Sequence, residues 1–370
     1  MLSCGSVWMY TVRMCTISKT PVMQLGSNLD GDRLVSDKIN RQVLLASRPE
    51  GVPQAAHFRI VETPIPVPGP GQVLVRNEWL SVEPAMRGWV NAAANYSEPV
   101  AVGAVMRSFA AGHVVASNHA DWAVGTPVTG LFGWQDYAVV EVSTIQRRVT
   151  ETDLPLSTAL GVMGINGVTA HFGLLEIGAP RAGQTVVVST AAGAVGSAVG
   201  QIAKLKGCRT VAIAGGEVKR RLCLERFGYD VAVDYKAAGF AAALAEACRG
   251  GVDVYFDNTA GPISDAVIAH LNVGARVVVC GTASIANWSP WPEGPRVERH
   301  LLVKRARMQG FVIFDHPEHA EPARADLARW LRAGELQYVE EVLDGIEHAP
   351  DAIAGLYRGE NLGKRLIRLY

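Results

Sequence analysis

The chain has 370 residues, of which 35 are lysine or arginine and 35 are aspartate or glutamate, so its formal net charge is zero. A balanced charge excludes the strong electrostatic attraction that binds nucleic acid or an anionic membrane surface. The six cysteines show no disulfide-framework spacing and no Cys-x-x-Cys pair, which is typical of reduced thiols in a cytoplasmic protein. No apolar run is long enough to cross a bilayer, so we expect small-molecule partners, no nucleic acid and no membrane.

The first part of the chain predicts an extension followed by a β-rich domain. Residues 1–34 lack periodicity and the apolar core of a secretory signal, and Val35 could be a translated GTG start codon, which would make those residues an annotation artefact. Beyond them, Gly and Pro turns separate strand-like segments, which we expect at 41–47, 72–80, 111–117, 126–130 and 134–140. This spacing predicts a compact, partly open β-barrel over residues 35–160.

The middle of the chain predicts a second domain over residues 161–324. Residues 154–178 have a helical period. After them, strands expected at 185–189, 209–214, 231–234, 253–256 and 275–280 alternate with helices expected at 194–206, 218–227, 239–249 and 262–271. This alternation is typical of an α/β fold with a doubly wound parallel sheet, the Rossmann architecture. A basic helix at 299–308, a strand at 309–314 and an amphipathic helix at 323–333 are expected to follow.

The junction after the first of these strands predicts a phosphate-binding turn. The run Gly193-Ala194-Val195-Gly196 leads from an apolar strand directly into a helix. Small residues there let the backbone approach a pyrophosphate, and the N–H groups and dipole of the helix face its negative charge. Ala191 stands where the first glycine of Gly-x-Gly-x-x-Gly would be, so the motif alone also fits another βα turn. Its place after the first strand of a doubly wound sheet favours a dinucleotide.

The end of the second strand bears on which dinucleotide binds. An acidic residue there accepts hydrogen bonds from the adenosine ribose, whereas basic residues accommodate a 2′-phosphate. Lys219 follows this strand and favours NADPH, although it could also belong to a solvated basic helix start. Glu217 is the counter-evidence, because it could face the ribose. Tyr235 follows the third strand and could contact the adenosine or lie on the surface.

Several strings along the chain together resemble one known family. They are Leu80-Ser81-Val82-Glu83-Pro84, Met86-Arg87-Gly88, Val105-Met106-Arg107, Gly133-Trp134-Gln135-Asp136-Tyr137, the glycine turn, Asp257-Asn258 and Asn361-Leu362-Gly363-Lys364. In this order they resemble the zinc-free medium-chain dehydrogenase/reductase superfamily, in its branch of NADPH-dependent alkenal/one reductases. The resemblance runs from about Ile39 to the end. It implies a GroES-like catalytic domain of residues 35–160, completed by residues 325–370, and a homodimer.

The resemblance also implies a set of cofactor-binding residues. The pyrophosphate would lie on Gly193, Ala194, Val195 and Gly196, the 2′-phosphate on Lys219, and the adenosine side at Tyr235. The nicotinamide half would meet Asn258, the segment from Cys280 and Gly281 to Ile285, the residues Phe311, Val312 and Ile313, and Asn361.

One position departs from the family pattern. Relatives have a tyrosine in the string after the Cys-Gly pair, where this chain has Ala286. If that tyrosine assists protonation, this protein must use water, the ribose hydroxyl or another residue. Tyr96 is the substitute that we would test first as proton donor, and Trp288 is placed to close the pocket. We expect Tyr96, Met163, Trp288 and Phe311 to line the substrate pocket, while Arg87 could contact substrate or form a structural ion pair.

The sequence lacks the ligand pattern of a catalytic zinc site. Such a site needs cysteine, histidine and acidic ligands around an open position. The nearest candidate, His113, has no following glutamate, and no cysteine lies between Cys15 and Cys208. We therefore expect no metal. Reduction of a conjugated C=C bond suits a site without metal, because a few hydrogen-bond donors are enough to stabilise the negative charge that develops on the enolate oxygen.

The sequence leaves three functional hypotheses. The first is NADPH-dependent reduction of α,β-unsaturated ketones and aldehydes by hydride transfer to the β-carbon. The second is an NADPH:quinone reductase, which would need the same hydride and the same kind of site. The third is a catalytically idle NADPH-binding redox sensor. This hypothesis is considered because Ala286 stands where relatives have a tyrosine.

Overall fold

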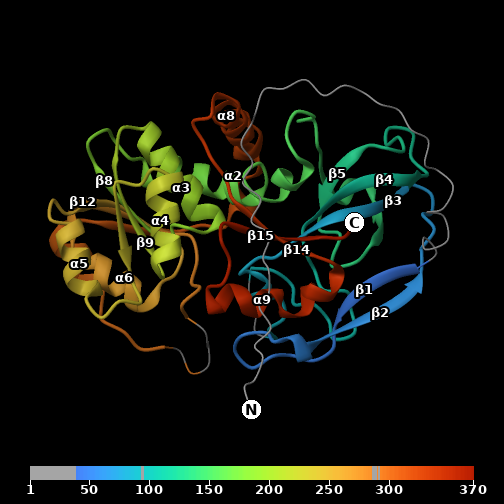
Figure 1. Cartoon of the computed structure of the whole chain (residues 1–370), viewed down its shortest axis with the longest axis horizontal. Helices are drawn as coiled ribbons and strands as arrows, with labels where there is room; N and C mark the ends of the chain where they lie inside the picture. The colour runs from blue at the N-terminus through green and yellow to red at the C-terminus, as the bar shows by residue number, and fades with distance from the viewer. Residues whose placement is uncertain (1–38, 93–95, 286–289, 291) are drawn as a thin grey trace, which may run out of the picture.

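The computed structural model describes residues 39–92, 96–285, 290 and 292–370, so the expected extension at 1–34 and Val35 fall outside the described residues. Two lobes lie side by side along the long axis of the molecule (Figure 1). One is built on a six-stranded parallel sheet, and the other on a seven-stranded and a two-stranded sheet. We call the lobe with the parallel sheet the first lobe and the other the second lobe. The described chain begins in the second lobe, forms the first lobe and then returns to the second lobe.

The six-stranded sheet confirms the doubly wound architecture. Its strands have the order β10-β9-β8-β11-β12-β13, and every adjacent pair is parallel. They are β8 (Thr185–Ser189), β9 (Arg209–Ala214), β10 (Val231–Asp234), β11 (Val252–Asp257), β12 (Leu271–Val279) and β13 (Arg307–Gly310). The chain order reverses between β8 and β11, and ligands of such sheets bind at the carboxyl ends of the strands beside this switch point.

Helices cover both faces of this sheet and bury it. One face packs against α2, α3 and α8, and the other against α5 and α6. The bounds are α2 (Ile165–Phe172), α3 (Ala194–Leu205), α4 (Glu217–Arg221), α5 (Phe240–Ala247), α6 (Gly261–Ile268), α7 (Glu298–Lys304) and α8 (Ala320–Ala333). Val186, Val187 and Val188 of β8 are therefore fully buried. The amphipathic helix is confirmed, since Leu327, Trp330 and Leu331 of α8 point into the core.

Several expected elements have different bounds in the structure. The basic helix expected at 299–308 ends at Lys304, and Arg307–Gly310 form β13 instead. Residues 154–178, which have a helical period, form a 3₁₀ helix (Leu156–Leu160), a turn, α2 and a π-helical segment (Gly173–Gly178), so the helical structure is interrupted between Leu160 and Ile165. A Cβ on Gly164 would lie 2.3 Å from the Ala159 carbonyl oxygen, which shows how tightly the chain folds back there. The strand expected at 309–314 ends at Gly310, and Ile313–Asp315 form a 3₁₀ turn.

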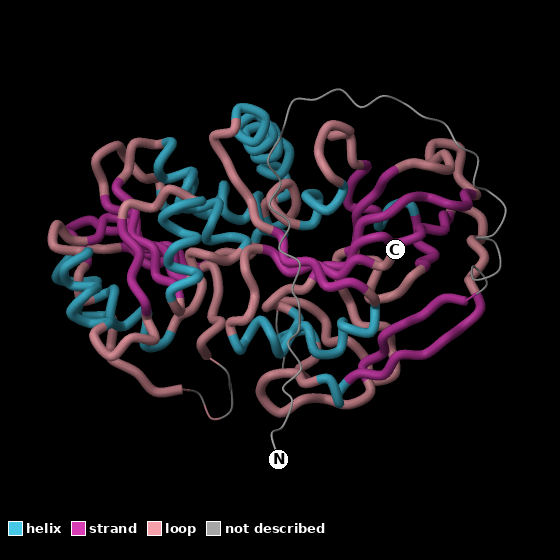
Figure 2. Tube along the Cα trace, in the orientation of Figure 1, coloured by secondary structure: helices cyan, strands magenta, loops and turns pink. Residues whose placement is uncertain are grey.

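The second lobe carries the antiparallel strands expected for the GroES-like fold (Figure 2). The hairpin β1 (Ile39–Leu45) and β2 (Phe58–Pro64) forms the small sheet. The larger sheet contains β3 (Gln72–Ser81), β4 (Ala110–Ser117), β5 (Pro127–Gly130), β6 (Tyr137–Glu141), β7 (Ile145–Arg148), β14 (Glu340–Asp344) and β15 (Lys364–Arg368). Helices α1 (Met86–Trp89) and α9 (Ala349–Arg358) contribute to its core.

A strand from the end of the chain joins this sheet to its beginning. β15 pairs with β3 in antiparallel register, with Leu366 opposite Ser81, and β14 continues the sheet beyond it. The path β14-β15-β3-β4-β5-β7 does not close on itself, in agreement with a partly open barrel. Just before β15, Gly363 forms a parallel bridge with Gly193 in the other lobe. The two lobes therefore meet at the expected phosphate-binding turn.

Candidate functional site

The turn after β8 is rigidly built. Thr190 adopts a left-handed φ of 53°, and Gly193 is the N-cap of α3. A Cβ on Gly196 would lie 2.3 Å from the Thr190 carbonyl oxygen, so only glycine fits where the helix passes the turn. The Tyr229 hydroxyl donates a hydrogen bond to the Gly196 carbonyl oxygen at 2.6 Å and fixes the helix from behind. The turn needs no ligand to hold its shape.

The N-terminus of α3 is suited to an anion. The first N–H groups of a helix have no partner inside it, and Gly193 has no side chain with which to cap them. The helix is 12 residues long, and its dipole places partial positive charge at this end. The residues predicted to hold a pyrophosphate lie together here, and their uncapped donors fit one: Gly193, Ala194, Val195 and Gly196.

Basic and aromatic side chains gather at the carboxyl end of β9. A Cβ on Gly215 would lie 2.8 Å from the Tyr235 ring and 3.0 Å from the Lys236 side chain. The ammonium groups of Lys219 and Lys236 lie 3.9 and 3.8 Å from the position of a Cβ on Gly359. Burial lowers the pKa of Lys219, and the positive charge of Lys236 lowers it further. Lys236 thus lies near both predicted residues, beside Tyr235 at Gly215 and beside Lys219 at Gly359.

The other charged residues of α4 are engaged in local ion pairs. Glu217, which could have faced a ribose, pairs with Arg220 at 2.6 Å. The guanidinium of Arg220 also donates to the Ala232 carbonyl oxygen at 3.1 Å. Arg221 pairs with Glu225 at 2.9 Å. These contacts leave the Lys219 ammonium as the cation of α4 that has no carboxylate within ion-pair distance among the described residues.

The loops after β11 and β12 meet β8 on the other side of the switch point. The Asn258 side-chain amide donates to the Ser189 carbonyl oxygen at 2.7 Å. The N–H groups of Cys280 and Gly281 donate to the Asp257 carbonyl oxygen at 2.8 and 3.1 Å. Burial, and secondarily the charge of Asp257, raises the pKa of the Cys280 thiol to about 12, so this thiol stays protonated at neutral pH. Three of the residues predicted to meet the nicotinamide half therefore converge here.

One short segment, residues 359–363, leads from the lysines to the phosphate turn, and we call the region that it borders between the lobes the crevice. It begins at Gly359, beside the two ammonium groups, and ends where the Gly363 N–H donates to the Ala192 carbonyl oxygen at 3.0 Å. Between these points, the Asn361 side-chain amide donates to the Gly363 carbonyl oxygen at 3.0 Å. The segment comes from the second lobe, so a ligand that fills the crevice touches both lobes.

A buried ion pair anchors this segment to the end of β3. The Lys364 ammonium donates to Ser81 Oγ at 2.5 Å, to Glu83 Oε1 at 2.6 Å and to the Val82 carbonyl oxygen at 3.2 Å. The second carboxylate oxygen of Glu83 accepts a hydrogen bond from Asn166 at 3.2 Å. Burial lowers the pKa of Lys364, and the charge of Glu83 opposes that effect. Removing one partner would leave an uncompensated buried charge. The pair therefore holds the start of β15 in a fixed position relative to the end of β3.

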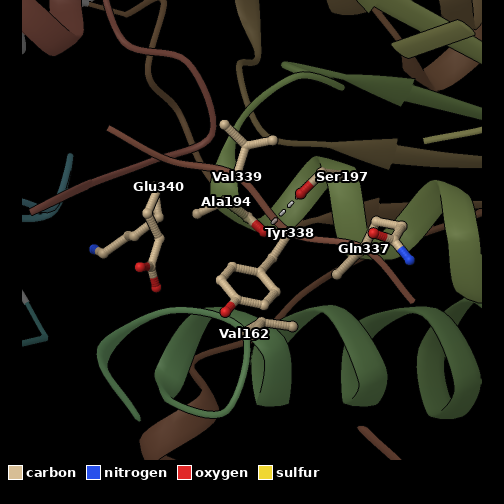
Figure 3. A pocket seen from close by; sticks show the side chains of 9 residues that line it. Val162, Ala194, Ser197, Gln337, Tyr338, Val339 and Glu340 are labelled. Atoms are coloured by element: carbon tan, nitrogen blue, oxygen red, sulfur yellow. Dashed lines mark hydrogen bonds between the residues drawn. The ribbon is translucent and has the colours of Figure 1, made fainter. Parts of the chain in front are cut away.

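A cavity of about 10 Å³ lies between this anchor and the first turn of α3 (Figure 3). Glu340 lies on one side of it, and Ala194 and Ser197 lie on the other. Glu340 Oε2 accepts a hydrogen bond from Ser157 at 2.8 Å, while its buried Oε1 has no hydrogen-bond partner. Burial raises the pKa of Glu340 to about 7, against the opposing effects of Ser157 and Lys364. Glu340 therefore exchanges its proton near neutral pH, close to the phosphate turn.

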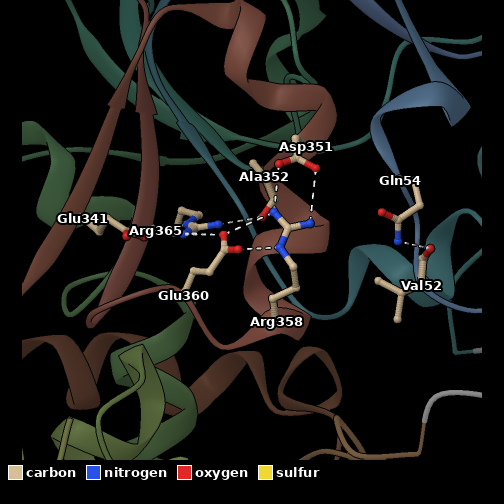
Figure 4. Close-up of polar contacts among 8 residues, drawn as sticks. All are labelled: Val52, Gln54, Glu341, Asp351, Ala352, Arg358, Glu360 and Arg365. Atoms are coloured by element: carbon tan, nitrogen blue, oxygen red, sulfur yellow. Dashed lines mark hydrogen bonds and ion pairs between the residues drawn. The ribbon is translucent and has the colours of Figure 1, made fainter. Parts of the chain in front are cut away.

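A second ion network holds the other end of segment 359–363 (Figure 4). Arg365 of β15 pairs with Glu341 of β14 at 2.6 Å and lies 3.9 Å from Glu360. Arg358, at the end of α9, binds Glu360 and pairs with Asp351 at 2.9 Å. Glu360 is thus held between two guanidinium groups. These contacts fix Gly359 beside the lysines.

Aromatic side chains form the contact between the lobes at the expected substrate side. The Phe311 ring lies against Phe172, with centroids 5.5 Å apart. Phe314, which is 46% exposed, stacks on Phe109 of the second lobe at 6.2 Å, and Trp89 meets Phe109 edge-on at 6.2 Å. Between Phe311 and Phe314 lie the predicted residues Val312 and Ile313, both partly buried. The segment after β13 therefore supplies an apolar wall that touches both lobes.

Tyr96, the predicted proton donor, belongs to the second lobe. It is 55% exposed, yet the protein around its hydroxyl raises the pKa of Tyr96, and the charge of Glu83 acts in the same direction. Arg87 donates to the Ile285 carbonyl oxygen, which gives it a structural contact between the lobes.

Not every predicted site residue joins the crevice. Met163 is 1% exposed and packs in the core beneath α2, so it presents almost no surface to a ligand. Trp288 and Ala286 lie outside the described residues. Lys236 escaped the sequence prediction although it directly follows Tyr235, and the partnership of Lys364 with Glu83 had no local signal because 281 positions separate them.

No group of three or more histidine, cysteine, aspartate or glutamate residues that could hold a metal ion occurs in the described part of the chain. His113, the nearest zinc-ligand candidate, pairs with Glu78 at 2.5 Å. Among the described helices, none has both the length and the apolar character that crossing a membrane requires.

Two family models match the chain in succession. Residues 41–147 match the N-terminal domain of oxidoreductase, and residues 194–329 match the zinc-binding dehydrogenase family. The first match lies in the second lobe, and the second covers the parallel sheet from α3 onward.

The alignments with relatives cover nearly the full length of this chain and of each relative. The NADPH-dependent curcumin reductase of Escherichia coli (strain K12) is 43% identical over 335 residues, which cover 89% of this chain and 97% of that protein. The NADP(+)-dependent 2-alkenal reductase of Nicotiana tabacum is 36% identical, with coverages of 89% and 97%. The crystal structure of CurA in complex with NADPH from Vibrio vulnificus has 45% identity and a TM-score of 0.85, and it covers 89% and 99% of the two chains. The chain therefore belongs to the medium-chain dehydrogenase/reductase superfamily, in the branch of alkenal and enone reductases.

Proposed function

We propose that this protein uses NADPH to reduce the C=C bond of α,β-unsaturated ketones and aldehydes. The structural observations that carry the cofactor assignment are the uncapped N-terminus of α3 and the lysine pair beside Gly359, which segment 359–363 connects. In this proposal Gly193, Ala194, Val195 and Gly196 hold the pyrophosphate, Lys219 and Tyr235 hold the adenosine end, and Asn258, Cys280, Gly281, Phe311, Val312, Ile313 and Asn361 surround the nicotinamide.

When bound, NADPH supplies a hydride for the β-carbon of a conjugated acceptor. The chain's own contribution is orientation and exclusion of water. Phe311 and the Phe314–Phe109 contact offer an apolar wall for a flat acceptor, and holding the acceptor in place removes much of the entropic cost of reaction. Tyr96, whose raised pKa keeps its hydroxyl protonated, is the proposed hydrogen-bond donor to the developing enolate and the proposed proton donor.

The relatives support this choice of acceptor. The names of the Escherichia coli and tobacco proteins describe NADPH- or NADP-dependent reduction of curcumin and of 2-alkenals. Both acceptors contain a C=C bond conjugated to a carbonyl group, and both relatives align with nearly the whole of this chain.

A parallel assay tests the proposal. The purified protein is supplied with NADPH and with an alkenal, a bulky aryl enone or a quinone, and both NADPH loss and the saturated product are measured. We expect turnover of the alkenal or enone and a product that lacks the C=C bond. Turnover of the quinone alone would identify a quinone reductase instead. Tight NADPH binding without turnover of any acceptor would support an idle sensor and overturn both enzyme functions.

We also propose that the protein is a cytoplasmic homodimer with lobes bounded at 35–160 plus 325–370 and at 161–324, except that α8, which crosses the bound at 324–325, packs in the core of the parallel-sheet lobe. Support for association comes from the outer edge of the parallel sheet. β13 pairs only with β12 among the described strands, and the neighbouring α7 exposes Leu302 (77%) and Val303 (50%). An exposed edge strand beside apolar side chains is a suitable surface for a second copy. The four described cysteines are free thiols, as suits a reducing compartment.

A further inference from the structure

Two lysines of the parallel-sheet lobe point at one place, and the described residues provide neither of them with an ion pair. The ammonium groups of Lys219 and Lys236 both lie within 4 Å of the Cβ position on Gly359. No carboxylate lies within ion-pair distance of either ammonium among the described residues, whereas the neighbouring Arg220 and Arg221 each have one. Like charges that converge in this way repel each other, and an anion bound between them would relieve the repulsion.

The backbone around the two lysines is fixed independently of any ligand. Asp234 Oδ1, at the end of β10, accepts a hydrogen bond from the Gly216 N–H at 3.0 Å and another from the Lys236 N–H at 2.9 Å. The Asp234 carboxylate thereby joins two turns. One directly precedes α4, the helix that carries Lys219, and the other carries Lys236. The Lys236 ammonium also lies 5.9 Å from the centroid of the Tyr235 ring, close enough for a cation–π contact.

Gly359 leaves open the space next to the two ammonium groups. It is the C-cap of α9 and has a φ of 71°, a conformation that favours glycine. A side chain at this position would reach toward both ammonium groups. The end of α9 therefore borders the space beside the two ammonium groups on the side of the second lobe and does not fill that space.

We propose that Lys236 is a second specificity-determining residue for NADPH, and that it binds the 2′-phosphate jointly with Lys219. The inference rests on the proposed use of NADPH. In this proposal the two ammonium groups bind the 2′-phosphate from two sides, an arrangement that we call the clamp. Asp234 joins the two turns that carry the lysines, and Gly359 borders the site from the second lobe. The half-buried Lys219 provides the fixed side of the clamp, and the exposed Lys236 provides the adjustable side.

Binding of two nucleotide fragments tests the clamp without any acceptor or turnover. Calorimetry with adenosine 2′,5′-bisphosphate and with 5′-AMP is performed on the wild type, Lys236→Ala, Lys236→Arg and Lys219→Ala. Lys206→Ala is the matched control, because this exposed lysine lies at the opposite end of α3. We expect Lys236→Ala to weaken 2′,5′-bisphosphate binding on the order of tenfold and to leave 5′-AMP binding unchanged, because a lost hydrogen bond to a charged group has about that effect.

Lys236→Arg, which keeps the positive charge, is expected to retain most of the affinity, and Lys206→Ala all of it. An unchanged 2′,5′-bisphosphate affinity in Lys236→Ala, together with a loss in Lys219→Ala, would overturn the clamp and leave Lys219 as the only determinant tested. Equal losses of both ligands in Lys236→Ala would also overturn it, because they would indicate an effect on adenosine. A wild type that does not prefer the 2′,5′-bisphosphate would refute the NADPH assignment itself.

Discussion

Tyr96 is the residue on which the proposed proton transfer depends. Because burial raises the pKa of Tyr96 above its ordinary value near 10, its hydroxyl remains protonated throughout the neutral range. We expect Tyr96→Phe to lower kcat by a factor of at least about 10², the lower range for general acid catalysis, with little change in the KM for NADPH. Stopped-flow and steady-state kinetics with an enone measure both quantities.

Tyr370→Phe is a suitable control, because this 52% exposed tyrosine stacks on Arg76 at the end of the chain. An unchanged kcat in Tyr96→Phe would instead assign proton donation to water or to the ribose hydroxyl.

Glu340 links the stability of the protein to pH. Its pKa is about 7 in the folded chain, compared with 4.5 for an ordinary glutamate, so the folded state binds more protons between these two values. Stability is therefore expected to fall as pH rises from about 4.5 to about 7 and to change no further above this window. Glu340→Gln removes this dependence and is expected to be more stable than the wild type by at most about 3 kcal/mol at pH 8.

Urea unfolding at pH 5, 6, 7 and 8 measures the effect, with the exposed Glu318→Gln as control. Parallel pH profiles for the wild type and Glu340→Gln would show that Glu340 ionises with an ordinary pKa.

Site residues with a local signal were easier to predict than those defined by a distant partner. Tyr235 directly follows the end of β10 and Lys219 comes shortly after β9, and the structure places Lys236 beside both of them, at Gly215 and at Gly359. Lys364 and Glu83 are individually unremarkable charged residues, and only the pairing of β15 with β3 makes them a buried ion pair. Such a pairing depends on three-dimensional topology, which no local pattern contains.

At the scale of elements, the short connection before β15 is the most constrained part of the crevice. Gly363 has a φ of 66°, and a Cβ there would lie 2.1 Å from the Val339 carbonyl oxygen. We expect Gly363→Ala to cost about 2 kcal/mol or more through strain and collision, and to weaken NADPH binding as the connection moves away from Ala192.

Denaturant unfolding and NADPH fluorescence titration measure the two effects. Gly334→Ala is the matched control, because Gly334 has a similar φ of 73° but no atom within 4 Å of its Cβ position. If both variants lose the same stability, the collision with Val339 contributes nothing.

The strands of the parallel sheet were predicted most accurately because burial on both faces leaves continuous β-branched runs such as Val186-Val187-Val188. The segment 154–178 was predicted poorly, since its apolar period continues through Gly161 and Gly164 while the backbone breaks there. The strand expected at 309–314 failed for a related reason. Phe311 is apolar enough for a sheet, but it packs on Phe172 beyond the strand end.

At the scale of the whole molecule, the crevice joins two lobes that have separate cores. A ligand that touches both lobes stabilises them together, so NADPH is expected to shift unfolding as one cooperative transition. At a concentration 100 times its Kd, the shift corresponds to about 2.7 kcal/mol. Calorimetric scans with and without NADPH check this, and a shift of only one of two resolved transitions would show that the cofactor engages a single lobe.

The pairing of β15 with β3 also has a consequence for how the protein is made. A ribosome releases β3 early and β15 only after all six strands of the parallel sheet, which lie between them in the chain. The parallel-sheet lobe can acquire its core while synthesis continues, whereas the larger sheet of the other lobe must wait with an open edge beside β3. The same late residues carry Gly363 to the phosphate turn. Nascent chains therefore complete the region around the phosphate turn only after the strands of the parallel-sheet lobe have been synthesised.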